Sequence, residues 1–174
     1  MKYLKKLKDL FIEEIKTSWK YYTTLLVILL ITLFFNLIYS NPVIVDGNSM
    51  NPTLHDLDFG YIRHTNTSNP IERFDVCVID LKTKEIVKRA IGLPFEKVEY
   101  KDNVLYINDE VIDDPYNFGS TTDFCEVLGE NEYFCLGDNR TNSADSRYYG
   151  PFAYEQIVGN GLLILFPFSN FGVK

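Results

Sequence analysis

Charged and apolar residues are sharply separated near the start of the chain. No charged residue occurs between Lys20 and Asp46, and residues 21–39 read YYTTLLVILLITLFFNLIY. At about 1.5 Å of rise per residue, a helix of ~19 such residues comes close to the roughly 30 Å hydrocarbon layer of a membrane. A cleaved signal peptide would have a shorter apolar core followed by a small-x-small site, whereas Ile38 is followed by Tyr-Ser-Asn-Pro. We therefore expect a retained transmembrane helix over residues 21–40.

The first twenty residues are basic and weakly periodic. They contain six lysines and three carboxylates, and apolar residues recur at spacings of three and four: Leu4, Leu7, Phe11, Ile15 and Trp19. This pattern predicts a basic amphipathic helix over residues 1–20 on the inner membrane surface, with a looser tail as the alternative. Because lysine-rich flanks stay in the cytoplasm, we expect the N-terminus inside and everything after residue 40 outside.

After residue 40, short runs of β-branched and aromatic residues alternate with polar turns. The predicted strands are Pro42–Val45, Phe59–Arg63, Asp75–Asp80, Glu85–Leu93, Lys97–Lys101, Val104–Ile107, Glu132–Leu136 and Gly161–Phe166. Many short strands without long helical periodicity predict a mainly β fold with antiparallel pairing. Residues 113–131 have no clear period and are expected to form a surface loop. We therefore expect one β-rich extracytoplasmic domain over residues 41–174.

The composition narrows the range of partners. The chain has 174 residues and a formal net charge of −7, and the residues after Lys20 include 11 basic and 21 acidic side chains. Binding to the phosphates of a nucleic acid needs a basic surface. The acidic character of the chain after Lys20 therefore excludes a nucleic-acid partner. An apolar fraction of 46% excludes wholesale disorder, and the length supports one domain of ordinary size.

Three cysteines follow the expected anchor. Cys77 and Cys135 lie in apolar strand patterns, where a free thiol packs as a small hydrophobic group, and Cys125 lies in the irregular segment. The sequence leaves a Cys125–Cys135 disulfide open. There is no Cys-x-x-Cys pair and no histidine cluster, so a metal site is not expected.

Ser49 is the first candidate for nucleophilic chemistry. It lies between Gly47 and Pro52 in a segment that can hold a sharp, exposed backbone with a free hydroxyl, although an ordinary turn has the same composition. A Ser-His-Asp triad with His55 and Asp58 is the obvious competitor. Those three residues crowd within ten positions, and no separate elements would support their three roles.

Lys88 is the candidate base. In the predicted strand 85–93, alternation places it on one face with Ile86 and Ala90. A lysine held against apolar neighbours loses hydration, so its neutral amine is favoured and can act as a base near neutral pH. A lysine on a solvated sheet face would show the same periodicity, so the pattern alone leaves both interpretations open.

A dense cluster of hydrogen-bonding groups covers residues 137–150 and cannot be a core strand. It is either a solvated loop or a tightly bonded one in which Asp138 or Asp145 pairs with Arg140 or Arg147. A bonded loop of this kind could carry a hydroxyl that positions a neighbouring base.

Three sequence boxes thus follow one N-terminal anchor in a fixed order. They read Ser49-Met-x-Pro-Thr-Leu54, Lys88-Arg-x-Ile-Gly-Leu-Pro94 and Gly137-Asp-Asn-Arg-x-x-Ser-x-Asp-Ser-Arg147. Together they resemble the successive boxes of the bacterial type I signal peptidases, and weaker matches extend the resemblance over residues 20–172. The resemblance implies a membrane-anchored serine endopeptidase without a cofactor. It also implies a β-rich catalytic core with a small inserted β-region, here residues 97–131.

The resemblance also implies a role for each matching residue. Ser49 would be the nucleophile, with its backbone N–H as one oxyanion donor, and Lys88 the general base. Ser143 would hydrogen-bond the lysine and orient it. Asp145 and Arg147 would form an ion pair that braces the site.

Met50 would help to shape the substrate pocket, by the same resemblance. Some relatives carry a serine as a second oxyanion donor at the position of Gly47, so here that donor is unassigned. The implied substrates are secretory preproteins, cut after small-x-small sites at the outer face of the lipid membrane. Two alternatives are a self-cleaving Ser/Lys repressor-type protease and a catalytically silent, membrane-tethered β-module that binds secreted proteins.

Overall fold

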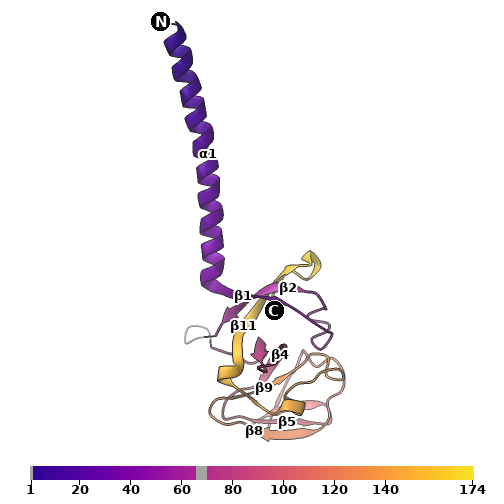
Figure 1. Ribbon diagram of the computed structural model, residues 1–174. Helices are drawn as coiled ribbons and strands as arrows, with labels where there is room; N and C mark the ends of the chain where they lie inside the picture. Colours follow the sequence, from indigo (N-terminus) through magenta and orange to yellow (C-terminus); the bar gives the residue numbers. More distant parts are fainter. Residues whose placement is uncertain (1, 66–69) are drawn as a thin grey trace. The chain divides into compact units, whose positions relative to one another are not determined.

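The computed structural model describes residues 2–65 and 70–174, and the chain forms two compact units that divide after Ile38. The first unit is a single helix, α1 (Lys2–Ile38), which runs through the expected amphipathic segment and residues 21–38 of the expected apolar helix, two residues short of its expected end (Figure 1). The helix is uninterrupted because it contains neither glycine nor proline. The hydroxyl of Thr24 donates to the Lys20 carbonyl, so it needs no solvent partner.

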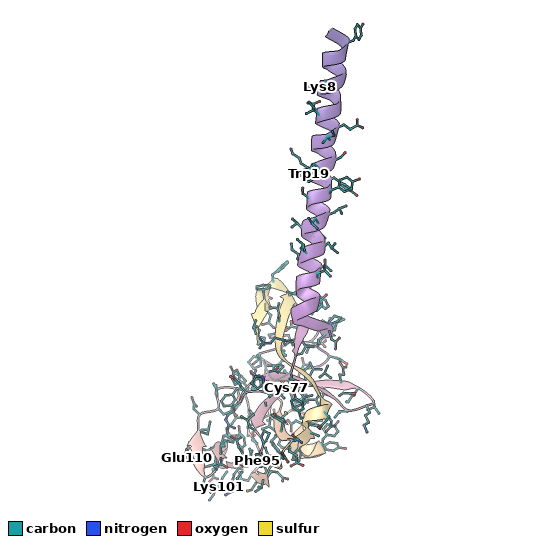
Figure 2. The ribbon with its side chains drawn as sticks, turned by 90° about the vertical axis from the view of Figure 1, so that its left-hand side faces the viewer. Lys8, Trp19, Cys77, Phe95, Lys101 and Glu110 are labelled. Carbon is teal, nitrogen blue, oxygen red and sulfur yellow. The ribbon has the colours of Figure 1, made fainter. Side chains whose placement is uncertain are left out.

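Over the described part of the chain, no helix is long and apolar enough to cross a membrane. The expected span 21–40 includes residues 34–40, whose side chains lie outside the described residues. Of the expected amphipathic positions, Ile15 and Trp19 are exposed, and Figure 2 shows Trp19 projecting from the helix. The other three positions of that pattern also lie outside the described side chains.

The second unit is built on a large antiparallel sheet with the strand order β1-β2-β11-β3-β4-β9-β10 and with β12 paired to β11. These strands are β1 (Tyr39–Ile44), β2 (Phe59–His64), β3 (Val76–Asp80), β4 (Glu85–Gly92), β9 (Glu132–Leu136), β10 (Phe152–Ala153), β11 (Ile157–Phe166) and β12 (Gly172–Val173). In Figure 1, β1, β2 and β11 run side by side, in agreement with their pairing.

A second, four-stranded antiparallel sheet has the order β7-β6-β5-β8. Its strands are β5 (Lys97–Lys101), β6 (Val104–Ile107), β7 (Glu110–Ile112) and β8 (Phe124–Val127), all within residues 97–131. The remaining elements are short: α2 (Ser146–Tyr149), η1 (Tyr154–Gln156) and η2 (Phe168–Asn170). The mainly β, antiparallel architecture predicted from the sequence is confirmed.

The sequence did not predict the short strands β7, β10 and β12, and two further differences have a clear cause. Residues 113–131 are not all loop, because β8 pairs with β5 along residues 124–127. Strand β11 begins four residues earlier than expected, at Ile157, because Gly159 is a strand residue here and not a turn residue. A Cβ on Gly159 would lie 2.4 Å from the carbonyl oxygen of Arg63, so only glycine allows β2 to approach this closely.

The interior divides into three hydrophobic clusters, one of which joins the two sheets. In that cluster, Ile91 of β4 packs with Val98 of β5 and with Phe134 of β9. All three cysteines are free thiols, so the Cys125–Cys135 disulfide that the sequence left open is absent. Figure 2 shows Cys77 inside the β-rich unit, where it is fully buried.

Candidate active site

Ser49 lies in a compact turn between β1 and β2. The turn is anchored to the core, because its residues Met50 and Leu54 are buried in a hydrophobic cluster. The Leu54 N–H donates to the Met50 carbonyl at 3.0 Å, and the Gly47 N–H donates to Asp56 Oδ1 at 2.9 Å. Ser49 itself is only half-buried. The turn therefore holds a reachable hydroxyl on a fixed backbone.

Lys88 reaches that hydroxyl from the middle of β4. Its side chain is 4% exposed, and its Nζ donates to Ser49 Oγ at 2.9 Å and to the Val87 carbonyl at 2.7 Å. Burial lowers the pKa of Lys88 from 10.5 to about 8. The nearby titratable groups that also act on this pKa are Asp145, Lys84, Cys135 and Asp138. Lys88 is thus a buried lysine, which decides between the two interpretations that periodicity left open.

The segment after β9, residues 137–147, closes over the turn that carries Ser49; it is called the 137–147 loop here, and its last two residues begin α2. The Asn139 N–H donates to the Ser49 carbonyl at 3.0 Å, and Asn139 Nδ2 donates to the Asn48 carbonyl at 3.2 Å. A Cβ on Gly137 would lie 2.5 Å from the Ser49 carbonyl oxygen and 2.3 Å from Ser143 Oγ. Glycine is therefore required for the loop and the turn to come this close.

Ser143 lies in this loop, beside Gly137. Its Oγ is buried and has no hydrogen-bond partner among the described residues, while the two acceptors of Lys88 are Ser49 and Val87. The structure therefore brings Ser143 to the site without the hydrogen bond to Lys88 that the family resemblance implies. Its hydroxyl is near enough to Asp145 to help lower the pKa of that carboxyl group.

Asp145 and Arg147 form an ion pair at the end of the loop. Arg147 donates to both carboxylate oxygens, with Nε 2.9 Å from Oδ1 and Nη2 2.8 Å from Oδ2. The Gly137 N–H donates to Asp145 Oδ2 at 3.0 Å. Burial opposes ionisation of Asp145, but the hydrogen bonds from Arg147 and Gly137 outweigh it and lower its pKa below 3.8. A charged Asp145 thus fixes both ends of the loop.

Two further arginines of the site have partners that the sequence did not reveal. Arg89 donates from Nε and Nη2 to the buried Asp138 at 2.8 and 2.7 Å, and its guanidinium carbon lies 3.5 Å from the ring centroid of Tyr116. Arg140 pairs with Asp114 at 2.7 Å. The sequence signal for Arg89 was its position directly after Lys88. Because neighbouring strand residues point to opposite faces, Arg89 lies on the face of the strand opposite Lys88.

The histidine alternative finds no support in the geometry. His55 is exposed, and its Nδ1 lies 4.0 Å from Asp58 Oδ2. Asp58 accepts hydrogen bonds from the His55 N–H and from the side chain of Asn170. The hydroxyl of Ser49 accepts its hydrogen bond from Lys88 and not from His55.

A cavity of about 210 Å³ opens beside the two candidate residues. It is lined by residues 42–46 of β1 and the following turn, by Ser49 and Met50, by Val78, and by residues 84–88. Met50 therefore belongs both to the core and to the cavity wall. Among the described residues, no group of three or more His, Cys, Asp or Glu side chains could hold a metal ion. The chemistry available beside the cavity is a hydroxyl in contact with a buried amine.

Comparison with known proteins gives a consistent result. The family model "Signal peptidase, peptidase S26" matches residues 18–166. Signal peptidase I S of Bacillus subtilis (strain 168) is 37% identical over 157 residues, covering 82% of this chain and 85% of that protein. Signal peptidase I T of the same organism is 39% identical over 144 residues, covering 74% and 75%.

Two further similar proteins come from Streptococcus and Enterococcus. Signal peptidase I of Streptococcus pneumoniae serotype 4 is 32% identical over 192 residues, covering 85% of this chain and 92% of that protein. A crystal structure of a signal peptidase I from Enterococcus faecalis V583 is 34% identical, covers 51% of this chain and 94% of that chain, and superposes with a TM-score of 0.47. From the family match and the identity to curated relatives, the chain belongs to the signal peptidase S26 family.

Proposed function

We propose that this protein is a signal peptidase I, a serine endopeptidase that removes signal peptides from secreted preproteins with Ser49 as nucleophile and Lys88 as general base. The observation that carries the catalytic assignment is the 2.9 Å contact between Lys88 Nζ and Ser49 Oγ at a buried lysine. A serine hydroxyl is a weak nucleophile until a base takes its proton. A desolvated amine with a pKa of about 8 can take that proton near neutral pH.

The reaction follows from this contact. With Lys88 neutral, Ser49 O–H donates to its lone pair, and Oγ attacks the scissile carbonyl as the proton moves to Nζ. The Ser49 N–H stabilises the oxyanion of the tetrahedral intermediate. The ammonium then protonates the leaving amine, which departs as the new N-terminus of the mature protein. Lys88, neutral again, deprotonates the water that hydrolyses the acyl-enzyme and frees Ser49.

The supporting residues act through the 137–147 loop. The Asp145–Arg147 pair holds the loop, and the Gly137 N–H bonded to Asp145 brings it against the turn that carries Ser49. The buried hydroxyl of Ser143 lies against Gly137 in this loop, and we expect it to hydrogen-bond the lysine as that side chain changes its protonation state.

The substrate is an extended peptide with small side chains next to the cut. Strand β1 is the last strand of its sheet and is hydrogen-bonded only to β2 in the described chain, so its other edge can pair with a peptide backbone. The cavity of about 210 Å³ is smaller than the roughly 300–1,000 Å³ of ordinary ligand pockets, which favours small residues. Met50 supplies part of its apolar wall.

The location of the enzyme completes the proposal. Residues 1–20 are cytoplasmic, residues 21–40 form a single membrane-spanning helix, and residues 41–174 form the extracytoplasmic catalytic domain, with 97–131 as its insert. The support is the absence of charge from Tyr21 to Val45 and the lysine-rich flank before it. Only nine residues lie between Tyr39 and Ser49, so the site acts near the outer face of the bacterial membrane.

A preprotein cleavage assay tests the function. The full chain in detergent or vesicles should cut a preprotein after its small-x-small site, and Ser49→Ala should lose all cleavage because no nucleophile remains. His55→Ala is the matched control and should cleave like the wild type. Binding of preprotein without cleavage by the wild-type chain would favour the catalytically silent β-module instead.

A further inference from the structure

A buried group of polar side chains joins the four-stranded sheet to the 137–147 loop. Its centre is Arg140, which is 2% exposed. Arg140 Nε donates to the Gly137 carbonyl at 2.9 Å, inside the loop. Its Nη2 donates to Asp114 Oδ2 at 2.7 Å, and its Nη1 donates to the hydroxyl of Tyr100. Because Tyr100 lies in β5 and Asp114 follows β7, one arginine connects the two parts of the molecule.

Each nitrogen of the Arg140 guanidinium group donates to one acceptor, and two of these acceptors are hydrogen-bonded to each other. The Tyr100 hydroxyl accepts from Arg140 and donates to Asp114 Oδ2. Burial raises the pKa of Tyr100, so the hydroxyl keeps the proton that it donates. The other oxygen of Asp114 accepts from the Tyr116 N–H at 3.0 Å. Such a network fixes one geometry, since any shift leaves a buried polar group without its partner.

Arg140 also fixes the backbone around Asn139, the residue that hydrogen-bonds to the turn carrying Ser49. Asn139 holds the carbonyls of Asn48 and Ser49 by its side chain and its backbone. Arg140 follows it directly, and Gly137, whose carbonyl Arg140 Nε holds, precedes it by two residues. The backbone N–H of Arg140 also donates to the Phe118 carbonyl at 3.1 Å. The backbone on both sides of Asn139 is therefore fixed, through Arg140, to the four-stranded sheet and to the segment between its strands β7 and β8.

Building on the proposed function, we propose that Arg140, held by Asp114 and Tyr100, is a positioning residue for the cleavage reaction. It fixes the loop that holds the backbone of Ser49, and thereby keeps Ser49 Oγ within reach of Lys88 Nζ. It contacts neither reacting atom. A misplacement of about 1 Å in a reacting group can cost on the order of 100-fold in rate. Loss of the contacts of Arg140 should therefore lower kcat, although Arg140 is remote from the reacting atoms.

A purely stabilising role is the competing explanation, and the choice of variants separates the two. Arg140→Lys keeps the positive charge opposite Asp114 but cannot reach three acceptors in a fixed plane. Tyr100→Phe removes one hydroxyl and leaves the arginine–aspartate pair in place. Asp109→Asn is the control, because Asp109 forms an exposed ion pair with Lys97 in the same sheet and does not touch the loop.

The kinetic experiment measures kcat, KM and the pH profile of kcat/KM for the full chain with a small-x-small peptide as substrate. The thermal unfolding midpoint of each variant is measured separately. We expect Arg140→Lys to lower kcat by about tenfold or more, and Tyr100→Phe by about threefold, with KM changed by less than about twofold. The pH midpoint should move upward, because a displaced Ser49 lets water reach Lys88. None of these variants alters the charged or titratable groups that act on Lys88, namely Lys84, Cys135, Asp138 and Asp145.

A lower unfolding midpoint with unchanged kcat and unchanged pH midpoint in Arg140→Lys would overturn the proposal and leave the network a stabilising role only. If Arg140→Lys does not fold, the same comparison is made with Tyr100→Phe, and wild-type kcat in that folded variant overturns the proposal. Equal effects in Asp109→Asn would also overturn it. Absence of cleavage by the wild-type chain would instead count against the proposed function, so the two failures are distinct.

Discussion

At the scale of single residues, the site depends on the amine of Lys88, which is buried away from water. A lysine that is 4% exposed loses most of the hydration of its charged form, and its two hydrogen-bond acceptors, Ser49 Oγ and the Val87 carbonyl, are both uncharged. The carboxylates of Asp145 and Asp138 favour the charged form, but burial outweighs them. The result is an amine that is available as a base at a pH where an ordinary lysine is protonated.

The first prediction is a rise of activity with pH. Since burial lowers the pKa of Lys88 to about 8, the neutral, active form is the minority below that pH and the majority above it. We therefore expect kcat/KM on a small-x-small peptide to rise through a midpoint near pH 8. In Lys88→Arg the activity should be lost at every accessible pH, because a guanidinium does not deprotonate.

The control for this prediction is His55→Ala, whose pH profile should match the wild type. Appreciable cleavage by Lys88→Arg, together with a loss of activity in His55→Ala, would contradict the Ser/Lys mechanism and favour a histidine base.

At the scale of elements, the sequence predicted strands well where apolar positions formed a clear pattern and poorly where a strand has almost no buried residue. Strands β5, β6 and β9 have the predicted bounds. Strands β5 and β6 alternate more and less buried residues, and β9 is an almost continuous run of buried residues. Strand β8 was missed because only Phe124 of its four residues is even partly buried, so it shows no periodicity. It exists because β5 offers it an unpaired edge, which is a property of the partner strand.

The 137–147 loop shows the same limit within the site. Its hydrogen-bonding residues are evident from the sequence, but their pairing is not, because Asp138 and Arg140 have partners that lie 49 and 26 positions away. Only the local pair, Asp145 with Arg147, was among the pairings that the sequence left open. Family resemblance supplied the residue roles that spacing could not.

The second prediction concerns Gly137, the point where loop and turn meet. Gly137→Ala would place a Cβ 2.5 Å from the Ser49 carbonyl and 2.3 Å from Ser143 Oγ, so the loop must withdraw. We expect kcat to fall by about 100-fold, as for a reacting group displaced by about 1 Å. The matched control is Gly129→Ala, whose Cβ meets only the end of the flexible Glu132 side chain, at 3.2 Å.

Peptide cleavage, with circular dichroism to confirm folding, measures the effect of both glycine variants. A folded Gly137→Ala chain with nearly wild-type kcat would show that the loop does not control the position of the nucleophile. Loss of activity in Gly129→Ala to the same extent would show that any glycine substitution in this unit is damaging.

At the scale of the whole molecule, three segments far apart in the chain supply one site. The turn after β1, the middle of β4 and the loop after β9 come together because β4 and β9 are neighbours in the large sheet and the loop reaches the turn through Asn139. The buried bridge from Arg140 then makes the four-stranded sheet part of the same assembly. The sequence shows the order of the segments, but their convergence depends on non-local strand pairing.

The charge distribution along the chain leads to the last prediction, which concerns orientation in the membrane. Residues 1–20 have an excess of three positive charges, the following residues up to Val45 have none, and the rest of the chain is strongly acidic. Lysines near a span are retained in the cytoplasm, so the part after residue 41 should face outward. A protease added to intact bacterial protoplasts that contain the chain should digest residues after 41 and spare the first twenty, detected with a tag at each end. Lysed protoplasts are the control, in which both ends should be cut, and protection of the acidic part in intact protoplasts would reverse the proposed orientation.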